Sequence, residues 1–410
     1  MFNHQLCRDI ITICQVLNIV SNAQASFKKR RLPMYLNRVD FIDHLKILMA
    51  EDSFEQMYGM SPEIFFHLVE ILRPTLEPKW KNQHDPIDAT ITVAIGLRYL
   101  RAGSILDLKL LYGLSRKAAY TSVHKFLDAV LDHPLLAIRL PANKDEWDCI
   151  LKGFALVSKL AVFYGCVGAI DGLFQTCTCP SKNEVSGNVL SYMSGHHCSY
   201  GLNCQAMCDA RLRFLYFAVV APGSCNDCVS ILRCTALMES IRQLPFGYFI
   251  VGDAAYICSD RLLTPFVGAQ RDNFDYDNYN FYLSQCRIRI EMAFGRMKSK
   301  FYILKNVLSC KYKTASKILS ACARLHNYII DMQFDDGKTY DLISKRNSFE
   351  LYMYNHPNPK TILRRPFNIN PNFASQEGSS LMRELMVKRV RNFGLVRPIV
   401  QVHQRIDQQN

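Results

Sequence analysis

An ordered series of apolar segments in the middle of this chain constrains its fold more than any other feature. Three short apolar runs at 167–178, 202–209 and 213–220 have the length and composition of β-strands. A helical pattern follows at about 226–241, and a fourth buried strand is expected at 248–252. Because strands and helices are interleaved, the sequence predicts an α/β core, with a mixed sheet flanked by helices.

Three acidic residues occupy settings that suit metal-dependent phosphodiester chemistry. Asp171 lies within the first strand-like run, Asp253 directly follows the fourth, and Glu291 lies in an amphipathic helical stretch. Three carboxylates match the preference of Mg²⁺ (or Mn²⁺) for hard oxygen ligands. Two such ions roughly 4 Å apart can activate a water or a 3′-hydroxyl and stabilise the leaving oxygen at phosphorus. Taken singly, each residue is equally explained by a turn, a helix cap or a solvated helix face.

The helix that carries Glu291 has two neighbouring faces. A buried stripe is predicted at helical spacing, formed by Ile290, Phe294, Met297 and Phe301. Arg287 and Lys298 share the neighbouring face with Glu291. We expect these two cations to support the site, either by contacting DNA phosphates or by balancing the acidic cluster. Lys300, at the end of the same helix, is expected to contact DNA.

A fourth carboxylate, Asp227, follows a Pro-Gly-Ser turn at the start of a predicted helix. Its simplest role is to cap that helix and complement the helix dipole. We therefore expect Asp227 and its neighbour Asn226 to support the site rather than to bind metal.

Five segments, in consistent order over roughly residues 60–330, resemble signatures of PIF/Harbinger-type DDE transposases and of the nucleases derived from them. They are VGAIDG ending at Gly172, APGSCND ending at Asp227, VGDAAY ending at Tyr256 with Leu263-Thr-Pro265, EMAFGRMK beginning at Glu291 with Phe301, and Leu325-His-Asn327. The resemblance implies an RNase H-like catalytic core with Asp171, Asp253 and Glu291 as its DDE triad. Asn226 departs from the family, which more often has His there.

The residue pattern of 35–160 predicts mostly helices. Ser61-Pro62 is typical of a helix start, and a second helix is expected at 87–101. The segment 105–131 has the pattern of a helix-turn-helix-like hairpin. Its second helix is expected to expose a DNA-contacting set, Arg116, Lys117, Tyr120, His124 and Lys125. An ordinary helical hairpin is the alternative interpretation.

Composition narrows the partners and the compartment. The net charge of +13 suits a polyanion such as double-stranded DNA, although an acidic protein or a membrane surface would also fit. The 16 cysteines lack the dense spacing of a secreted mini-domain, which favours reduced thiols in nucleus or cytosol. No apolar run reaches the ~20 residues of a membrane span. The apolar run at 10–20 imitates a signal peptide but lacks a basic segment before it.

We therefore expect four parts: an N-terminal arm at 1–34, a helical DNA-interaction domain at 35–160, an RNase H-like nuclease domain at 161–332, and a linker with a C-terminal helix at 333–410. Lys28-Lys-Arg-Arg31 in the arm is read as a nuclear signal or a solvated turn. The last helix is expected at 380–393, with Gly394 ending it. A zinc site from Cys177, Cys179 and the His196-His-Cys198 run is disfavoured because paired Cys spacing is missing.

Two functional classes follow. The first is a metal-dependent DNA endonuclease or transposase, which also joins DNA if strand transfer is retained. The second is a domesticated, non-catalytic protein that keeps the fold to bind DNA or chromatin. The intact carboxylate set favours the first class. No large separate DNA-recognition domain is evident, and in the resembled superfamily a Myb-like protein often supplies recognition, so we expect such a partner in the nucleus. A homo-oligomer is a further expectation.

Overall fold

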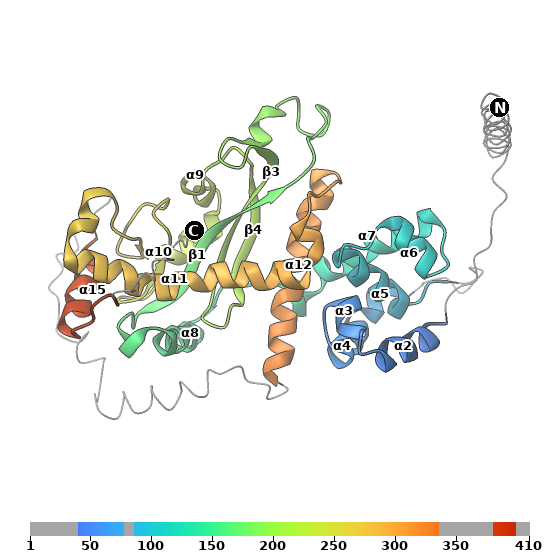
Figure 1. Ribbon diagram of the computed structural model, residues 1–410, viewed down its shortest axis with the longest axis horizontal. Coiled ribbons are helices and arrows are strands. Elements are labelled where there is room, and N and C mark those ends of the chain that lie inside the picture. Colours follow the sequence, from blue (N-terminus) through green and yellow to red (C-terminus); the bar gives the residue numbers. More distant parts are fainter. Residues whose placement is uncertain (1–39, 78–85, 336–379, 399–410) are drawn as a thin grey trace, which may run out of the picture.

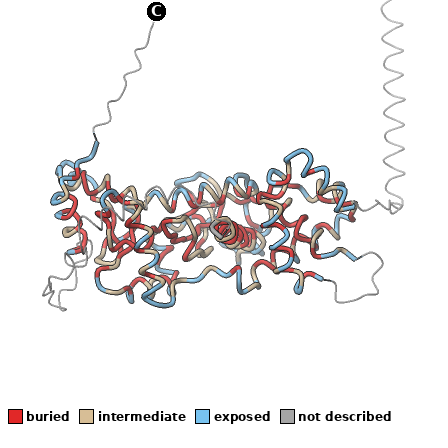
Figure 2. The backbone as a smooth tube through the Cα atoms, turned by 90° about the horizontal axis from the view of Figure 1, so that it is seen from below, coloured by how far each residue is buried: buried red, intermediate tan, exposed pale blue. Residues whose placement is uncertain are grey.

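The computed structural model describes residues 40–77, 86–335 and 380–398. The expected N-terminal arm with its 28–31 basic cluster and the linker at 336–379 lie outside the described residues. A helical region and an α/β region lie at opposite ends of the molecule, with one long helix between them (Figure 1). Buried residues run through both regions (Figure 2).

The α/β region is built on a mixed sheet with the strand order β4-β3-β1-β5-β6. Its strands are β1 (Cys166–Thr176), β3 (Ser199–Cys208), β4 (Phe214–Pro222), β5 (Phe249–Val251) and β6 (Leu262–Leu263). β1, β3 and β4 pair antiparallel, whereas β1, β5 and β6 pair parallel. The short β2 (Met193–Ser194) pairs with the start of β3. All four expected strands are present, and β2 and β6 are additions.

Helices cover both faces of the sheet. One face packs against α11 (Phe274–Lys300), and the other packs against α9 (Asp227–Leu232) and α10 (Thr235–Arg242). The prediction of a single helix at 226–241 is therefore wrong, because two helices occupy this segment. The chain leaves helical geometry at Cys234, which is only 1% exposed, and so α9 and α10 each bury their own apolar residues. α8 (Lys144–Val157) packs on β1.

The long helix α11 keeps its predicted buried stripe. Ile290, Met297 and Phe301 are fully buried, and Phe294 nearly so. α15 (Leu381–Asn392) packs along α11, with Ser380 as its N-cap and with Gly394 in the left-handed region (φ +61°) just after its end. The expected C-terminal helix is confirmed.

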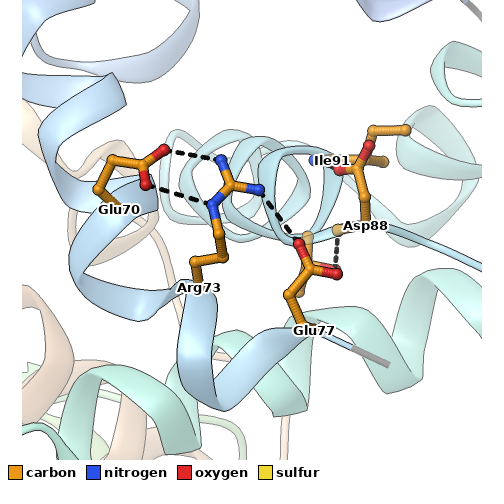
Figure 3. Close-up of polar contacts among 6 residues, drawn as sticks. Glu70, Arg73, Glu77, Asp88 and Ile91 are labelled. Atoms are coloured by element: carbon orange, nitrogen blue, oxygen red, sulfur yellow. Dashed lines mark hydrogen bonds and ion pairs between the residues drawn. The ribbon is translucent and has the colours of Figure 1, made fainter. Parts of the chain in front are cut away.

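The helical region consists of α2 (Phe41–Ala50), α3 (Phe54–Tyr58), α4 (Pro62–Leu76), α5 (Ala89–Leu100), α6 (Ile105–Leu111) and α7 (Arg116–Asp132). Pro62 occupies the first turn of α4 as predicted. On the surface of α4, Arg73 pairs with both Glu70 and Glu77 (Figure 3). Within the described ranges, no helix combines the length and apolarity that a membrane span requires.

The helix α12 (Tyr312–Asp335) joins the two regions by packing on both α7 and β4. Its Leu325-His-Asn327 segment fixes the turn between β3 and β4. The Nε2 atom of His326 lies 2.8 Å from the carbonyl oxygen of Leu212. The Asn327 side chain accepts from the backbone N–H of Phe214 and donates to its carbonyl, each at 2.7 Å. The role of this motif is therefore structural: it holds the turn between β3 and β4 against α12.

Candidate active site

Asp171 lies in the middle of β1, on the face of the sheet that α11 covers. Side chains alternate along a strand, and Ala169 and Leu173 on either side pack into the core formed with α11. Its Oδ1 accepts a hydrogen bond of 2.8 Å from the backbone N–H of Gly172. Burial raises the pKa of Asp171 to about 7, and the nearby carboxylates of Asp253 and Asp227 add to this shift.

Asp253 follows the end of β5, after Gly252. Its Oδ1 accepts a 2.9 Å hydrogen bond from the backbone N–H of Ala255. Burial is again the main reason that its pKa is raised, and the negative charges of Asp227 and Glu291 add to the effect. Asp253 and Asp171 thus share one acidic environment at the centre of the sheet, although they are far apart in sequence.

Glu291 extends from α11 beside this environment, and its carboxylate pairs with Arg287 one turn earlier. The guanidinium of Arg287 also acts on Asp171 and Asp253, whose pKa values it lowers against the stronger effect of burial. Arg287 therefore lies close enough to the acidic centre for its charge to act on both aspartates. The Glu291 side chain is 45% exposed, so rotation about its own bonds meets little resistance.

The three carboxylates do not form a closed ligand set. Among residues 40–77, 86–335 and 380–398, no group of three His, Cys, Asp or Glu side chains is placed to hold a metal ion. The expected convergence of Asp171, Asp253 and Glu291 on one point is thus incomplete, because Glu291 is paired with Arg287. Cys177, from the disfavoured zinc cluster, is buried in the core.

Asp227 lies on the opposite face of the sheet from Asp171. Its Oδ1 accepts hydrogen bonds from the side-chain amides of Gln205, at 2.8 Å, and Asn203, at 3.1 Å. Gln205 in turn accepts a 2.7 Å hydrogen bond from the hydroxyl of buried Tyr256. Asp227 is therefore held by a chain of neutral donors that begins in the core.

Gly172 makes this packing feasible. A Cβ atom at Gly172 would lie 2.0 Å from Oδ1 of Asp227, well inside van der Waals contact. The helix cap expected from Asp227 is supplied instead by Asn226, whose side chain accepts a 2.9 Å hydrogen bond from Val229 N–H. A cap precedes the first helical residue, and α9 begins at Asp227 itself. Asp227 is thus free to turn towards the sheet.

Lys298 and His197 extend the site along α11 and the start of β3. Lys298 is half-buried, and burial lowers its pKa. The ring of His197 stacks on Phe174 with centroids 4.3 Å apart. The pKa of His197 is lowered mainly by burial and is also influenced by Asp227 and Lys298, so these groups are neighbours.

Sequence reasoning did not identify Gln205 or His197 as parts of this region. A signal for Gln205 is present: Asn203 and Gln205 are alternate amides in an otherwise apolar strand, so both face one side of the sheet. Polar groups in a buried strand need partners, and here the partner is Asp227. His197 offers no comparable signal, because its contact with Phe174 is tertiary.

Four of the five expected DNA-contacting residues of α7 line two hollows, and Arg116 lines neither. Arg116, Lys117, Tyr120 and Lys125 are exposed, and His124 is half-buried. Tyr120 and His124 line a hollow of about 260 Å³ together with Lys311. Lys117 and Lys125 line another of about 280 Å³.

Lys300 lies at the joint between the two regions, beside Glu55 and Arg101, and burial lowers its pKa. Its backbone carbonyl accepts a 2.9 Å hydrogen bond from Arg101, whose guanidinium also donates to the carbonyl of Gln56. This contact ties the helical region to the end of α11. Lys300 does not line either of the two hollows beside α7.

Comparison with known proteins agrees with this architecture. Residues 170–327, from β1 to α12, match the family described as DDE superfamily endonuclease. Over 301 residues the chain is 25% identical to "Protein ALP1-like" from Arabidopsis thaliana, covering 68% of this chain and 71% of the relative. It is 24% identical over 301 residues to "Putative nuclease HARBI1" from Bos taurus, covering 72% and 82% respectively. No solved structure matches the chain. The chain therefore carries a DDE superfamily endonuclease domain and is a distant homologue of these Harbinger-derived proteins.

Proposed function

We propose that this protein is a metal-dependent DNA endonuclease with an RNase H-like core, in which Asp171, Asp253 and Glu291 hold two divalent ions. One observation carries the proposal. Burial and neighbouring carboxylates raise the pKa of both Asp171 and Asp253, so the centre lacks positive charge. Arg287 sets one positive charge against the carboxylates of Asp171, Asp253, Glu291 and Asp227.

The residues present fit Mg²⁺ or Mn²⁺. Their donor atoms are carboxylate oxygens, and no thiolate or imidazole would have to take part. When bound, the ions would supply activation of a water and stabilisation of the leaving oxygen at phosphorus. Asp171 and Asp253 are fixed by backbone hydrogen bonds from Gly172 and Ala255. Glu291 would complete the set by leaving its partner Arg287.

The remaining residues have supporting roles in this proposal. Arg287, once separated from Glu291, offers its guanidinium to a phosphate oxygen. Asp227 adds negative charge from the opposite face of the sheet and keeps its place through Gln205. Lys298 lies on the same helix and offers a second cation towards the DNA backbone. Asn226 acts through the helix by capping α9.

Double-stranded DNA is the substrate that we propose. The net charge of +13 favours a polyanion, and α7 exposes Arg116, Lys117 and Lys125 on its surface. Tyr120 and His124 would add aromatic contacts. We propose a nuclear location, a Myb-like partner for sequence recognition, and assembly into a homo-oligomer. These three proposals rest on the resemblance to Harbinger-type transposases and on composition.

A cleavage assay tests the function directly. The purified chain is incubated with a supercoiled plasmid in Mg²⁺, in Mn²⁺, or in EDTA. We expect nicked or linear DNA with either metal and intact plasmid in EDTA. Cleavage that persists in EDTA would contradict a metal-dependent centre. Binding of DNA with no cleavage in either metal would support the second class, a non-catalytic DNA-binding protein, for which the pairing of Glu291 with Arg287 is the favouring observation.

A further inference from the structure

A hollow of about 330 Å³ lies on α11 next to the acidic centre. Of the site residues described above, Arg287 lines it. Two parts of the chain that are distant in sequence form it: the loop after β6 together with the first half of α11, and the segment that follows α15. Its walls include three arginines and a single acid, namely Arg271, Arg287, Arg397 and Asp277. The charged groups of the hollow therefore sum to an excess of positive charge.

The hollow and the acidic centre share one face of α11. Asp277, Asn280, Ser284, Arg287 and Glu291 follow one another at spacings of three and four residues, which places them in one row along the helix. Arg287 belongs to both, because it lines the hollow and pairs with Glu291. With a rise of 1.5 Å per residue, Ser284 lies ~10 Å along the helix from Glu291.

The walls of the hollow are fixed by hydrogen bonds that do not involve the charged heads. The Asn280 side chain bridges the backbone of Phe266, accepting from its N–H at 2.8 Å and donating to its carbonyl at 3.0 Å. The segment after α15 is held on α11 by two contacts. Tyr282 donates to the carbonyl of Val396 at 2.8 Å, and Asn278 accepts from the backbone N–H of Arg397 at 2.8 Å.

Two of the arginines differ in how they are engaged. Arg271 is exposed, forms no ion pair within the described ranges, and has one hydrogen bond, from Nε to the carbonyl of Phe266 at 3.4 Å. Its terminal nitrogens form no hydrogen bond with the described residues, so they are available to a ligand. Arg397 pairs with Asp277 at 2.7 Å while its side chain is still 54% exposed. This pair positions the guanidinium without covering it.

We propose that this arginine hollow, defined by Arg271, Arg287 and Arg397, binds a backbone phosphate of the DNA strand beside the scissile phosphate. The inference rests on the proposed function, because it takes DNA as the substrate. Guanidinium groups from these two parts of the chain match the several oxygens of a phosphate. The segment after α15 is thereby part of the substrate-binding surface, although it lies outside the DDE-matching residues 170–327.

Salt-dependent binding tests the arginine hollow independently of catalysis. Affinity for a fluorescent 30-base-pair duplex is measured in EDTA over a series of NaCl concentrations for the unmodified chain, Arg271→Gln, Arg397→Gln and the double variant. Each lost phosphate contact lowers the slope of log K against log [NaCl] by about one. We expect that decrease for each single variant and about twice as much for the double variant.

Arg391→Gln is the matched control, because Arg391 is an exposed arginine of α15 that pairs with Asp275 and does not line the hollow. We expect its slope to equal that of the unmodified chain. Melting temperatures within a few degrees show that each variant is folded. Slopes unchanged in Arg271→Gln and Arg397→Gln, or a loss in Arg391→Gln as large as in Arg397→Gln, would overturn the arginine hollow alone. Absence of duplex binding by the unmodified chain would overturn the proposed function as well.

Discussion

The side-chain amide of Gln205 donates a 2.8 Å hydrogen bond to Oδ1 of Asp227, from a strand in the middle of the sheet to the first residue of a helix packed over it. Gln205 is fully buried and carries no charge, so it fixes the carboxylate without neutralising it. Asp227 is therefore held close to Asp171 and Asp253, from the other side of the sheet. The geometry makes Gln205 a positioning residue for the acidic centre.

Replacing Gln205 by Leu tests this role. The change removes the donor to Asp227 and leaves Tyr256 without its acceptor, so Asp227 should shift. Loss of such outer contacts typically weakens metal affinity or activity by about 10–100-fold. We expect the Mg²⁺ concentration for half-maximal cleavage to rise by this factor, with duplex affinity in EDTA changed less than about twofold.

Gln175→Leu is the matched control, since Gln175 is a buried amide on β1 that bonds to the carbonyl of Asn306 rather than to Asp227. Its Mg²⁺ requirement should stay unchanged. An equal loss in both variants would show that Gln205 acts through folding alone.

Gly172→Ala should reduce cleavage because the added methyl group clashes with Asp227. The added Cβ would meet Asp227 Oδ1 at 2.0 Å, so the carboxylate must leave its place. We expect cleavage to fall at least tenfold. Gly295→Ala is the comparison on α11, where the new Cβ meets nothing within 4 Å. In a helix interior that change should stabilise the protein by about 0.5–1 kcal/mol and leave cleavage intact. Full activity of Gly172→Ala would contradict the packing of Asp227 on this glycine.

The raised pKa of Asp171 predicts a conflict between stability and function. In the unfolded chain this carboxyl loses its proton near pH 4, but in the folded protein only near pH 7. Folding stability without metal should therefore fall as the pH rises from about 4 to 7. Asp171→Asn lacks this loss and should be more stable than the unmodified chain at pH 7.5 in EDTA, by roughly 2–4 kcal/mol.

Thermal melts at two pH values test this. The advantage of Asp171→Asn should vanish near pH 3, below the pKa of the unfolded chain, where the carboxyl is neutral in both states. Added Mg²⁺ should raise the melting temperature of the unmodified chain more than that of the variant. A variant that is less stable at pH 7.5 would show that Asp171 is not destabilised by its surroundings.

The lowered pKa of His326 predicts that its contribution to folding stability falls as the pH falls, opposite to the contribution of Asp171. Burial lowers its pKa to about 4, so the folded protein holds a neutral imidazole where the unfolded chain would be protonated below about pH 6.5. Its contribution to stability is complete above pH 6.5 and is lost as the pH falls towards 4. Urea unfolding of His326→Gln and the unmodified chain at pH 7.5 and pH 4.5 should show a gap that narrows in acid. A gap independent of pH would mean that His326 does not titrate across this range.

Much of the core could be predicted from sequence, because apolar strands and a helical stripe depend on local periodicity. The four expected strands, the stripe at Ile290 and Met297, and the C-terminal helix are all present. The two-residue strands β2 and β6 are too short to show a period. The break at Cys234 depends on where α9 and α10 meet the sheet, which is a tertiary requirement that local pattern does not encode.

The site was only partly predictable. The pairing of Arg287 with Glu291 follows from their spacing of four residues on a helix. The placement of Asp227 depends on Gly172 and Gln205, which come from two other strands, and so its local position at a helix start pointed to a cap. The arginine hollow joins residues 265–287 to Arg397, more than 100 residues later, and this contact is tertiary.

The central claim is that Asp171, Asp253 and Glu291 together hold the metal ions for cleavage. Its most direct measurement is the rate of Mg²⁺-dependent duplex cleavage by Glu291→Gln, Asp171→Asn and Asp253→Asn, beside Asp275→Asn, an acid on the same α11 that pairs with Arg391 instead. Each triad variant removes one charged ligand and keeps its side-chain size. We predict that all three lose cleavage by at least a hundredfold while binding the duplex in EDTA normally, and that Asp275→Asn cleaves like the unmodified chain. Undiminished cleavage by any triad variant would contradict the account.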